Sequence, residues 1–342
     1  MYSSALCSSG NSHSNLDRFL QCVTPVVPSR TLPQSCLNDL NSLWQPLFKD
    51  TIEYFTLKDL WDCYNEWSAY GVGIPLMLES GETLMHYYVP YLSAIQIYSD
   101  KSVAVSRIQR DDGDGAECES DSWSDDSGSD NLSRSFSNSS KAWDAISVDS
   151  SCDQEGSWLT RVRLGYTYLQ YNEMSSPYWR VPLVDKITEL ARTHPALMTL
   201  RSVDLSPASW MAVAWYPIYP IPSMKNEKDL ATCFLTYHTL SSSFQDDETM
   251  CNDINIGKDT RCSEELGSVV AGEKSKKNKS GHKSLPPFGL ATYKFHGDIW
   301  LNPEFCDQER ILDLYSAADS WLKQLNAHHH DYNFFTYHHS TL

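Results

Sequence analysis

The sequence has no hydrophobic run that approaches the roughly 18 residues needed to cross a bilayer, so it predicts no membrane span. Its first residues, MYSSALCSSGNSHS, lack a basic segment followed by a long apolar one, so we expect no secretory signal. The ten cysteines include no CxxC pair, which argues against a zinc ribbon or a dithiol redox site. We therefore expect a soluble protein of the cytosol or the nucleus with free thiols.

Motifs of the common enzyme classes are also missing. The chain contains no GxSxG, GxxxxGK[ST], GxGxxG or HExxH. The sequence accordingly predicts no catalytic residue, no cofactor and no metal. Five histidines do gather in the C-terminal stretch NAHHHDYNFFTYHHS, but their spacing is irregular and no cysteine accompanies them. We expect this aromatic tail to dock back on the fold rather than to bind a metal ion.

Basic residues are few, and the net charge is −17. Residues 111–130 carry nine Asp or Glu and no Lys or Arg, which leaves −8 for the other 322 residues. An acidic chain of this kind is a poor nucleic-acid binder, because phosphate neutralisation needs clustered Lys and Arg. The 11 Trp, 19 Tyr and 11 Phe exclude a chain that is disordered throughout.

Two polar segments interrupt the apolar blocks. One, at about 100–156, is acidic and rich in serine, and the other, at about 241–284, is polar and rich in lysine. We expect both to be disordered inserts in a single domain, because the apolar blocks at the two ends of the chain are not self-sufficient. The prediction is a flexible N-terminus over 1–13 and one domain over 14–342.

Four helices are expected. Thr56 and Asp59 form a capping-box pattern ahead of LKDLWDCYNEWSAY, in which apolar residues form one stripe. A short helix should follow Ser14, another should begin at Pro182 and end before Pro195, and a fourth should cover about 308–325.

Six segments read as strands, at 92–98, 161–171, 197–203, 210–216, 231–238 and 289–297. Strand 210–216 is apolar on both faces, as expected of a central strand covered on both sides. A short turn between 197–203 and 210–216 favours an antiparallel hairpin. The fold class predicted is α+β, with a mainly antiparallel sheet of about six strands and three to four helices. A mixed sheet is the alternative.

The stretch AVAWYPIYPIP, residues 212–222, runs from this strand into three prolines. Pro217 and Pro220 lack a backbone N–H, so strand pairing should end there. The favoured interpretation is a segment that closes the core. The alternatives are the wall of a binding groove and an exposed PxxP ligand.

The leading functional hypothesis is a non-enzymatic intracellular module whose aromatic groove binds a protein or a peptide. Trp179, Trp215, Tyr216 and Tyr219 would line the groove, and Arg180 is suited to bidentate capture of a carboxylate or a phosphate. The sequence predicts no oligomeric state.

Two alternatives remain open. One is a hydrolase or transferase of unrecognised type, which would need at least two of six side chains to converge in one pocket: His86, His194, His238, His296, Glu173 and Asp185. The other is a phospho-regulated nuclear scaffold. Ser122 and Ser127 each precede an Asp by three residues, and the Lys cluster at 274–283 is a candidate import signal.

Several blocks together resemble one known family: SNLDRFL, FTLKDLWDCYNEWSAYGVGIPL, VPYLSAIQIY, GYTYLQYNEMSSPYWRVPLVDKI and DLSPASWMAVAWYPIYPIP. The chain resembles a plant protein family classed as domain of unknown function number 789. The resemblance covers nearly all of the ordered parts, from about Ser14 to the NFF near the C-terminus. It implies a plant origin and a single fold, and it transfers no activity, cofactor or catalytic residue.

Overall fold

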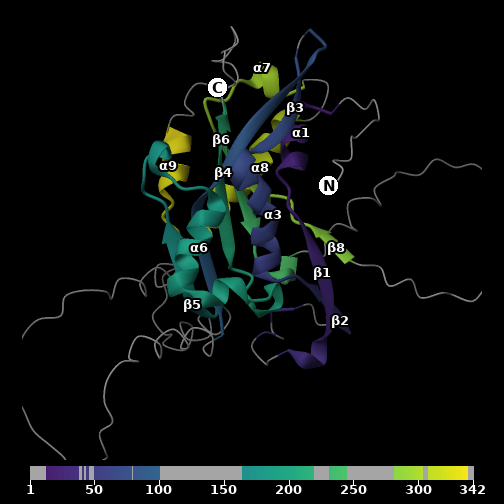
Figure 1. Ribbon diagram of the computed structural model, residues 1–342, viewed down its shortest axis with the longest axis vertical. Helices are drawn as coiled ribbons and strands as arrows, with labels where there is room; N and C mark the ends of the chain where they lie inside the picture. The colour runs from purple at the N-terminus through teal and green to yellow at the C-terminus, as the bar shows by residue number, and fades with distance from the viewer. Residues whose placement is uncertain are drawn as a thin grey trace, which may run out of the picture.

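The structure, a computed structural model, describes residues 13–37, 41, 44–45, 50–78, 80–100, 164–218, 231–244, 281–302 and 307–337. In these residues the chain forms nine strands in two antiparallel sheets, and helices pack on both faces of the larger sheet (Figure 1). No helix in the same residues is long and apolar enough to cross a membrane. The predicted α+β class is confirmed.

The larger sheet has the strand order β3-β4-β6-β7-β9, with β5 paired to β4 as its sixth strand. β4 is 17 residues long. It pairs along one edge with β3 and then β5, and along the other edge with β6. All pairs are antiparallel, so the mixed alternative is not formed. The bounds are β3 Val72–Met77, β4 Thr83–Ser99, β5 Tyr166–Asn172, β6 Trp210–Ile218, β7 Cys233–Thr239 and β9 Gly289–Tyr293.

Strand β6 is the centre of the core. Met211, Val213 and Trp215 face one hydrophobic cluster, whereas the residues between them face another. Residues 210–215 are all buried, which confirms the prediction of a strand covered on both sides. Pairing with β7 ends at Trp215, but pairing with β4 continues through Pro217 to Ile218. The predicted end at Pro217 is therefore right on one side only, since a backbone N–H points toward a single neighbouring strand.

Helices α1, α3 and α6 cover the face toward which Trp215 points, and each begins where the sequence predicts. The Ser14 side chain caps α1, and Thr56 with Asp59 forms the capping box of α3. Pro182 precedes α6, which ends at Thr193 before the next proline. The bounds are α1 Asn15–Cys22, α3 Leu57–Tyr70, α6 Leu183–Thr193 and α7 Gly297–Trp300.

Helices α8 (Asp307–Gln324) and α9 (His330–Tyr337) cover the opposite face. This face of the sheet presents small side chains, and a Cβ on Gly289 would lie only 3.0 Å from the Cβ of Ala318 on α8. The absence of a side chain at Gly289 lets the helix approach the sheet closely. Tyr332 and Phe335 of α9 are buried in the same cluster, which confirms that the aromatic tail docks back on the fold.

The smaller sheet was not predicted. It has the order β2-β1-β8 and lies at the lower right in Figure 1, with β1 Val26–Pro33, β2 Thr51–Tyr54 and β8 Gly281–Ser284. The predicted insert at 241–284 was too long at both ends, because β8 pairs with β1 and because Ser241 and Ser242 are buried. Lys283 belongs to β8, so it is not part of a free lysine loop. Residues 1–12, 101–163 and 245–280 lie outside the described residues.

The predicted strand at 197–203 was wrong, and with it the hairpin to 210–216. Two short 3-10 helices, Pro195–Met198 and Ser202–Asp204, occupy this stretch. Leu197 in the first helix and Val203 in the second are buried, and Leu200 is buried between the two, so the buried residues do not follow the two-residue period of a strand. Three further 3-10 helices are at Gln34–Cys36, Pro177–Trp179 and Ser242–Phe244.

A bulge alters the faces of β5. The register shifts where Ile97 pairs with Leu169 and Tyr98 pairs with Thr167, so Tyr168 is the extra residue. Tyr168 and Leu169 are consequently both buried, while Tyr166 is half exposed. Buried and exposed side chains therefore do not alternate strictly along β5.

Candidate functional site

An exposed aromatic segment joins β5 to α6. We call residues 174–181 the aromatic turn. Its centre is the 3-10 helix Pro177–Trp179, in which the Trp179 N–H donates to the Ser176 carbonyl at 2.9 Å. Tyr178 is 95% exposed and Trp179 is 83% exposed, although the next residue, Arg180, is buried. Two large aromatic side chains thus project into solvent from a turn whose next side chain points inward.

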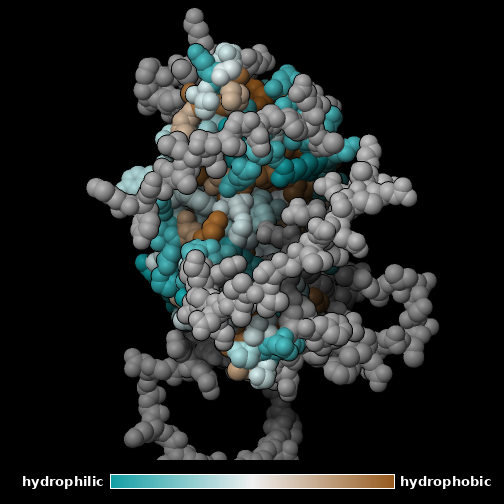
Figure 2. Space-filling view, turned by 90° about the vertical axis from the view of Figure 1, so that its right-hand side faces the viewer, coloured by the Kyte–Doolittle hydropathy of each residue, from teal (hydrophilic) through white to brown (hydrophobic). Residues whose placement is uncertain are grey.

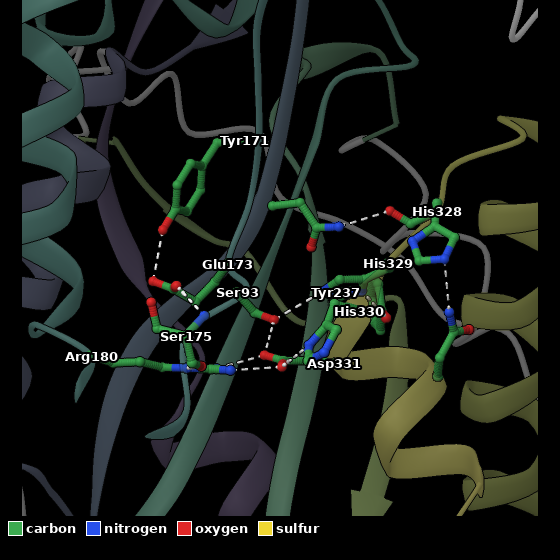
Figure 3. Close-up of polar contacts among 12 residues, drawn as sticks. Ser93, Tyr171, Glu173, Ser175, Arg180, Tyr237, His328, His329, His330 and Asp331 are labelled. Carbon is green, nitrogen blue, oxygen red and sulfur yellow. Dashed lines mark hydrogen bonds and ion pairs between the residues drawn. The ribbon is translucent and has the colours of Figure 1, made fainter. Parts of the chain in front are cut away.

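The Arg180 side chain makes a bidentate ion pair with Asp331 in the first turn of α9 (Figure 3). Its Nη1 lies 2.6 Å from Oδ2 and its Nη2 lies 2.7 Å from Oδ1. The Arg180 Nε also donates to the carbonyl of Ser175 at 2.9 Å, which closes the aromatic turn. The guanidinium lies over the Tyr216 ring, 5.8 Å from its centroid. One side chain therefore joins the turn, the sheet and the C-terminal helix.

A chain of hydrogen bonds continues from Asp331 into the sheet. Ser93 donates its hydroxyl proton to Asp331 Oδ2 at 2.5 Å, and its oxygen lies 2.9 Å from His329 Nε2. Tyr237 lies 2.8 Å from the other ring nitrogen, Nδ1. One proton arrangement satisfies every member: Tyr237 donates to Nδ1, protonated Nε2 donates to Ser93, and Ser93 donates to the carboxylate.

We call Ser93, Arg180, Tyr237, His329 and Asp331 the ion-pair cluster. The pKa values of its ionisable groups agree with this arrangement of protons. Burial opposes ionisation of Asp331, but the hydrogen bonds and the charge of Arg180 outweigh it, so the pKa of Asp331 is lowered. Burial would lower the pKa of Arg180, yet Asp331 raises it above its ordinary value. Burial lowers the pKa of His329 to about 4. At neutral pH the cluster thus holds one positive charge, one negative charge and a neutral imidazole.

Glu173 fixes the start of the aromatic turn. One of its carboxylate oxygens accepts from the Tyr171 hydroxyl at 2.7 Å, and the other accepts from the Ser175 N–H at 2.8 Å. Its own N–H donates to the carbonyl of Ser93 at 2.8 Å. Burial would raise the pKa of Glu173, but these hydrogen bonds and Arg180 lower it. Both ends of the turn are therefore attached to the ion-pair cluster.

Serine, histidine and aspartate meet here in an order that does not suit nucleophilic catalysis. In a hydrolytic triad the histidine lies between the serine and the carboxylate. In this cluster Ser93 lies between His329 and Asp331, and Ser93 is fully buried. Within the described ranges, no group of three or more His, Cys, Asp or Glu side chains could hold a metal ion. These contacts join the aromatic turn, strands β4 and β7 and the C-terminal segment.

The predicted groove is not formed as expected. Trp215 and Tyr216 are neighbours on β6 and point to opposite faces of the sheet. Trp215 is fully buried against Phe19 and Trp67, so it cannot line a solvent-reached wall. Tyr216 is half-buried beside Arg180, and Trp179 stands exposed on the turn. Arg180 does capture a carboxylate in the bidentate manner predicted, but that carboxylate is Asp331 of its own chain.

Several predicted residues lie elsewhere or outside the described residues. Of the six candidates for the enzyme alternative, Glu173 adjoins the cluster, because its N–H donates to the carbonyl of Ser93. The His238 ring contacts Thr236 and the Leu285 carbonyl, and the His194 ring contacts Thr193. The others are dispersed: His86 on β4, Asp185 on the outer face of α6 and His296 ahead of α7. Tyr219, Ser122 and Ser127 fall outside the described residues.

A cavity of about 510 Å³ lies between β9 and α8. Its walls are mainly apolar and come from Leu290, Phe295, Leu301, Ile311, Leu312 and Tyr315. Among the described residues, none of those predicted for the site lines it, and no residue of the ion-pair cluster does.

Sequence reasoning missed Ser93, Tyr237, His329 and Asp331. Ser93 and Asp331 are separated by 238 residues, so no local pattern could join them. The signal that was present is the sequence HHHD, interpreted as part of a histidine-rich tail although its aspartate is the residue that pairs with Arg180.

The family described as "Protein of unknown function (DUF789)" matches residues 14–335. No curated protein matches the chain. No solved structure matches it either.

Proposed function

This chain belongs to the DUF789 family, and we propose that it is a non-enzymatic module that binds another protein through the aromatic turn. The carrying observation is the exposure of Tyr178 and Trp179, at 95% and 83%, on a segment held by buried side chains. Met174 and Val181 add apolar surface at the two ends of the turn. As the composition suggests, we propose that this binding takes place in the cytosol or the nucleus.

The energetics favour a binding role for these rings. Burying a large apolar side chain contributes about 1.5–3 kcal/mol. Trp and Tyr are also the residues most enriched among interface hot spots. Because Arg180 and Glu173 already fix the turn, less conformational entropy is lost when a partner binds. A pre-formed turn with two solvent-exposed rings is therefore suited to insertion into a partner.

The surroundings of the turn indicate the chemistry of that partner. Arg180 is neutralised by Asp331, and Glu173 is occupied by Tyr171 and Ser175, so the turn offers no free charge from these two residues. We propose an uncharged apolar segment of a partner protein that packs around the two rings. Hydrogen-bond acceptors in this segment would accept from the Trp179 indole N–H and the Tyr178 hydroxyl.

The side of the molecule shown in Figure 2 offers a contrast. It lies away from β5 and α6, and among its coloured residues hydrophilic ones predominate while hydrophobic ones form small separate groups.

Exposed aromatic residues also anchor proteins at bilayer surfaces. A net charge of −17 opposes approach to anionic membranes, and this favours a protein partner.

The test is a selection of random peptides displayed on phage against the full chain. We expect enriched peptides that bind with micromolar Kd and lose at least tenfold in affinity to the Trp179→Ala variant. Tyr70→Ala is the matched control, since Tyr70 is 77% exposed at the end of α3 and should not matter. Failure to enrich peptides would overturn the proposal, as would equal binding to both variants.

A second arm tests the membrane explanation with vesicles of phosphatidylcholine. We expect the wild-type chain to remain in solution when the vesicles are sedimented. Sedimentation that depends on Trp179 would assign the turn to a lipid surface and overturn the protein-binding proposal.

A further inference from the structure

The aromatic turn and the C-terminal helix share one side chain. Arg180 closes the turn through its Nε, which donates to Ser175, and holds α9 through both Nη atoms, which donate to Asp331. The two side chains of the ion pair are only 2% and 3% exposed. The conformation of the turn therefore depends on a residue 151 positions further along the chain.

The segment that carries Asp331 is attached to the sheet by two kinds of contact. The polar ones are the His329 bridge between Ser93 and Tyr237 (Figure 3) and a hydrogen bond of 3.0 Å from Asn172 Nδ2 to the His328 carbonyl. The apolar ones are Phe335, which is fully buried against Tyr293 of β9, and Tyr332, which is buried against Tyr237 of β7. Phe335 is the apolar anchor that takes no part in the hydrogen bonds. The apolar anchor can thus be weakened without removing any atom of the ion pair.

From this geometry we infer that α9 is a clasp: its docking on the sheet sets the aromatic turn in its binding conformation, and its release opens the turn. The inference rests on the proposed function in that it names how the same site is regulated. When α9 leaves, Arg180 loses its carboxylate, and a buried unpaired guanidinium is strongly unfavourable. The side chain must then reach solvent, and the Ser175 contact that closes the turn is lost.

The coupling works in both directions. If α9 docking favours the binding conformation of the turn, a ligand on the turn must favour α9 docking by the same factor. Any event that removes α9, such as a competing partner that takes the C-terminal helix, would therefore release whatever the turn holds.

Hydrogen exchange of the full-length chain tests the clasp without any ligand. Two variants weaken α9 in different ways: Asp331→Asn removes the charge, and Phe335→Ala removes the apolar anchor. Leu322→Ala is the control, because Leu322 is buried in the same cluster but belongs to α8. The amides of Ser175, Trp179 and Arg180 report on the turn, and those of β6 report on the whole fold.

We expect both α9 variants to speed exchange in α9 and at the three turn amides by at least tenfold, with β6 remaining at least tenfold more protected than either. In the control, the ratio of the exchange rates in the turn and α9 to those in β6 should be the same as in the wild type. Two results would overturn the clasp. In one, α9 exchanges faster but the turn does not. In the other, the turn, α9 and β6 show equal protection, so that α9 is released only when the whole fold opens.

The peptide arm separates this inference from the proposed function. A selected peptide should bind Phe335→Ala at least threefold more weakly than the wild type and should slow exchange in α9 of the wild-type chain. Peptides that bind through Trp179 without changing the exchange rates of α9 would contradict the clasp and support the binding function. If the turn and α9 exchange together but the chain binds no peptide, the clasp is supported and the proposed binding function is overturned.

Discussion

The Arg180 guanidinium and the Asp331 carboxylate face each other through two parallel hydrogen bonds of 2.6 and 2.7 Å in the interior of the protein. Both charges have been removed from water, which is costly unless the geometry and the remaining hydrogen bonds compensate. Here Ser93 and Ser175 supply those further bonds. The pair thus attaches the C-terminal helix to the turn that exposes Tyr178 and Trp179.

Asp331→Asn should lower the free energy of unfolding by about 3–5 kcal/mol, because it leaves the buried Arg180 without a partner. The double variant Arg180→Met with Asp331→Leu should be more stable than this single variant, since no buried charge remains. Urea unfolding at pH 7.5 measures both.

The exposed pair of Lys58 and Asp62 provides the control for that prediction. Its side chains are 54% and 50% exposed, so Asp62→Asn should change the free energy of unfolding by less than about 0.5 kcal/mol. Similar losses for Asp331→Asn and Asp62→Asn would show that the buried pair does not hold the fold.

Replacement of the two tryptophans predicted for one groove should have different effects on the free energy of unfolding. Trp215→Ala should lower the free energy of unfolding by about 3–5 kcal/mol, because the side chain is fully buried in the core. Trp179→Ala should change it by less than about 0.5 kcal/mol, because the side chain is 83% exposed. Thermal and urea unfolding check the pair, and a large loss for Trp179→Ala would mean that the turn belongs to the core.

Acidification should destabilise the protein between about pH 6.5 and pH 4. Burial lowers the pKa of His329 and that of His238 to about 4, whereas an unfolded chain has histidine pKa values of about 6.5. Between these values the unfolded chain binds protons that the folded chain does not, so stability falls as the pH falls. Besides burial, Asp331 raises the pKa of His329, and Arg180, His330 and His328 lower it.

The expected loss from pH 7.5 to pH 5 is on the order of 1–2 kcal/mol for each of the two histidines. Urea unfolding at pH 7.5, 6.0 and 5.0 measures it, and His329→Gln should reduce the loss by about half. Asp331, whose pKa is also lowered, adds a loss of the same sign only at more acidic pH. A free energy of unfolding that stays constant from pH 7.5 to pH 5 would contradict the neutral buried imidazoles.

Gly289→Ala should destabilise the protein by about 1–3 kcal/mol, since the new Cβ would meet the backbone and Cβ of Ala318 at 3.0–3.1 Å. Gly297→Ala is the matched control, because its nearest neighbour would lie at 3.7 Å and no steric loss is expected. Equal stability of the two variants would show that α8 does not depend on close approach to β9.

Local signals were sufficient for much of the fold. The capping box at Thr56 and Asp59 marks the start of α3, and the apolar residues on both faces of 210–216 mark β6 as central. The same reasoning failed where a short apolar run fits two periods. Leu197, Leu200 and Val203 lie in a run that suggested a strand, yet Leu197 and Val203 belong to two short 3-10 helices and Leu200 lies between them.

The candidate site could be predicted only in part. Arg180 was identified by its capacity for bidentate pairing, and Trp179 by its place in an aromatic segment. The residues that form the cluster with Arg180 come from β4, β7 and the C-terminal segment. No pattern in the sequence shows which carboxylate will pair with a given arginine. Within the predicted groove, Trp215 was misplaced for a simpler reason: Trp215 and Tyr216 alternate to opposite faces of one strand, so they cannot line the same wall.

The most direct measurement of the central claim is the ratio of Kd values for one selected peptide on the wild-type chain and on Trp179→Ala, by isothermal titration calorimetry. If the aromatic turn is the binding surface, the variant should bind at least tenfold more weakly while its free energy of unfolding is unchanged within about 0.5 kcal/mol. Equal Kd values for the two proteins would contradict the account.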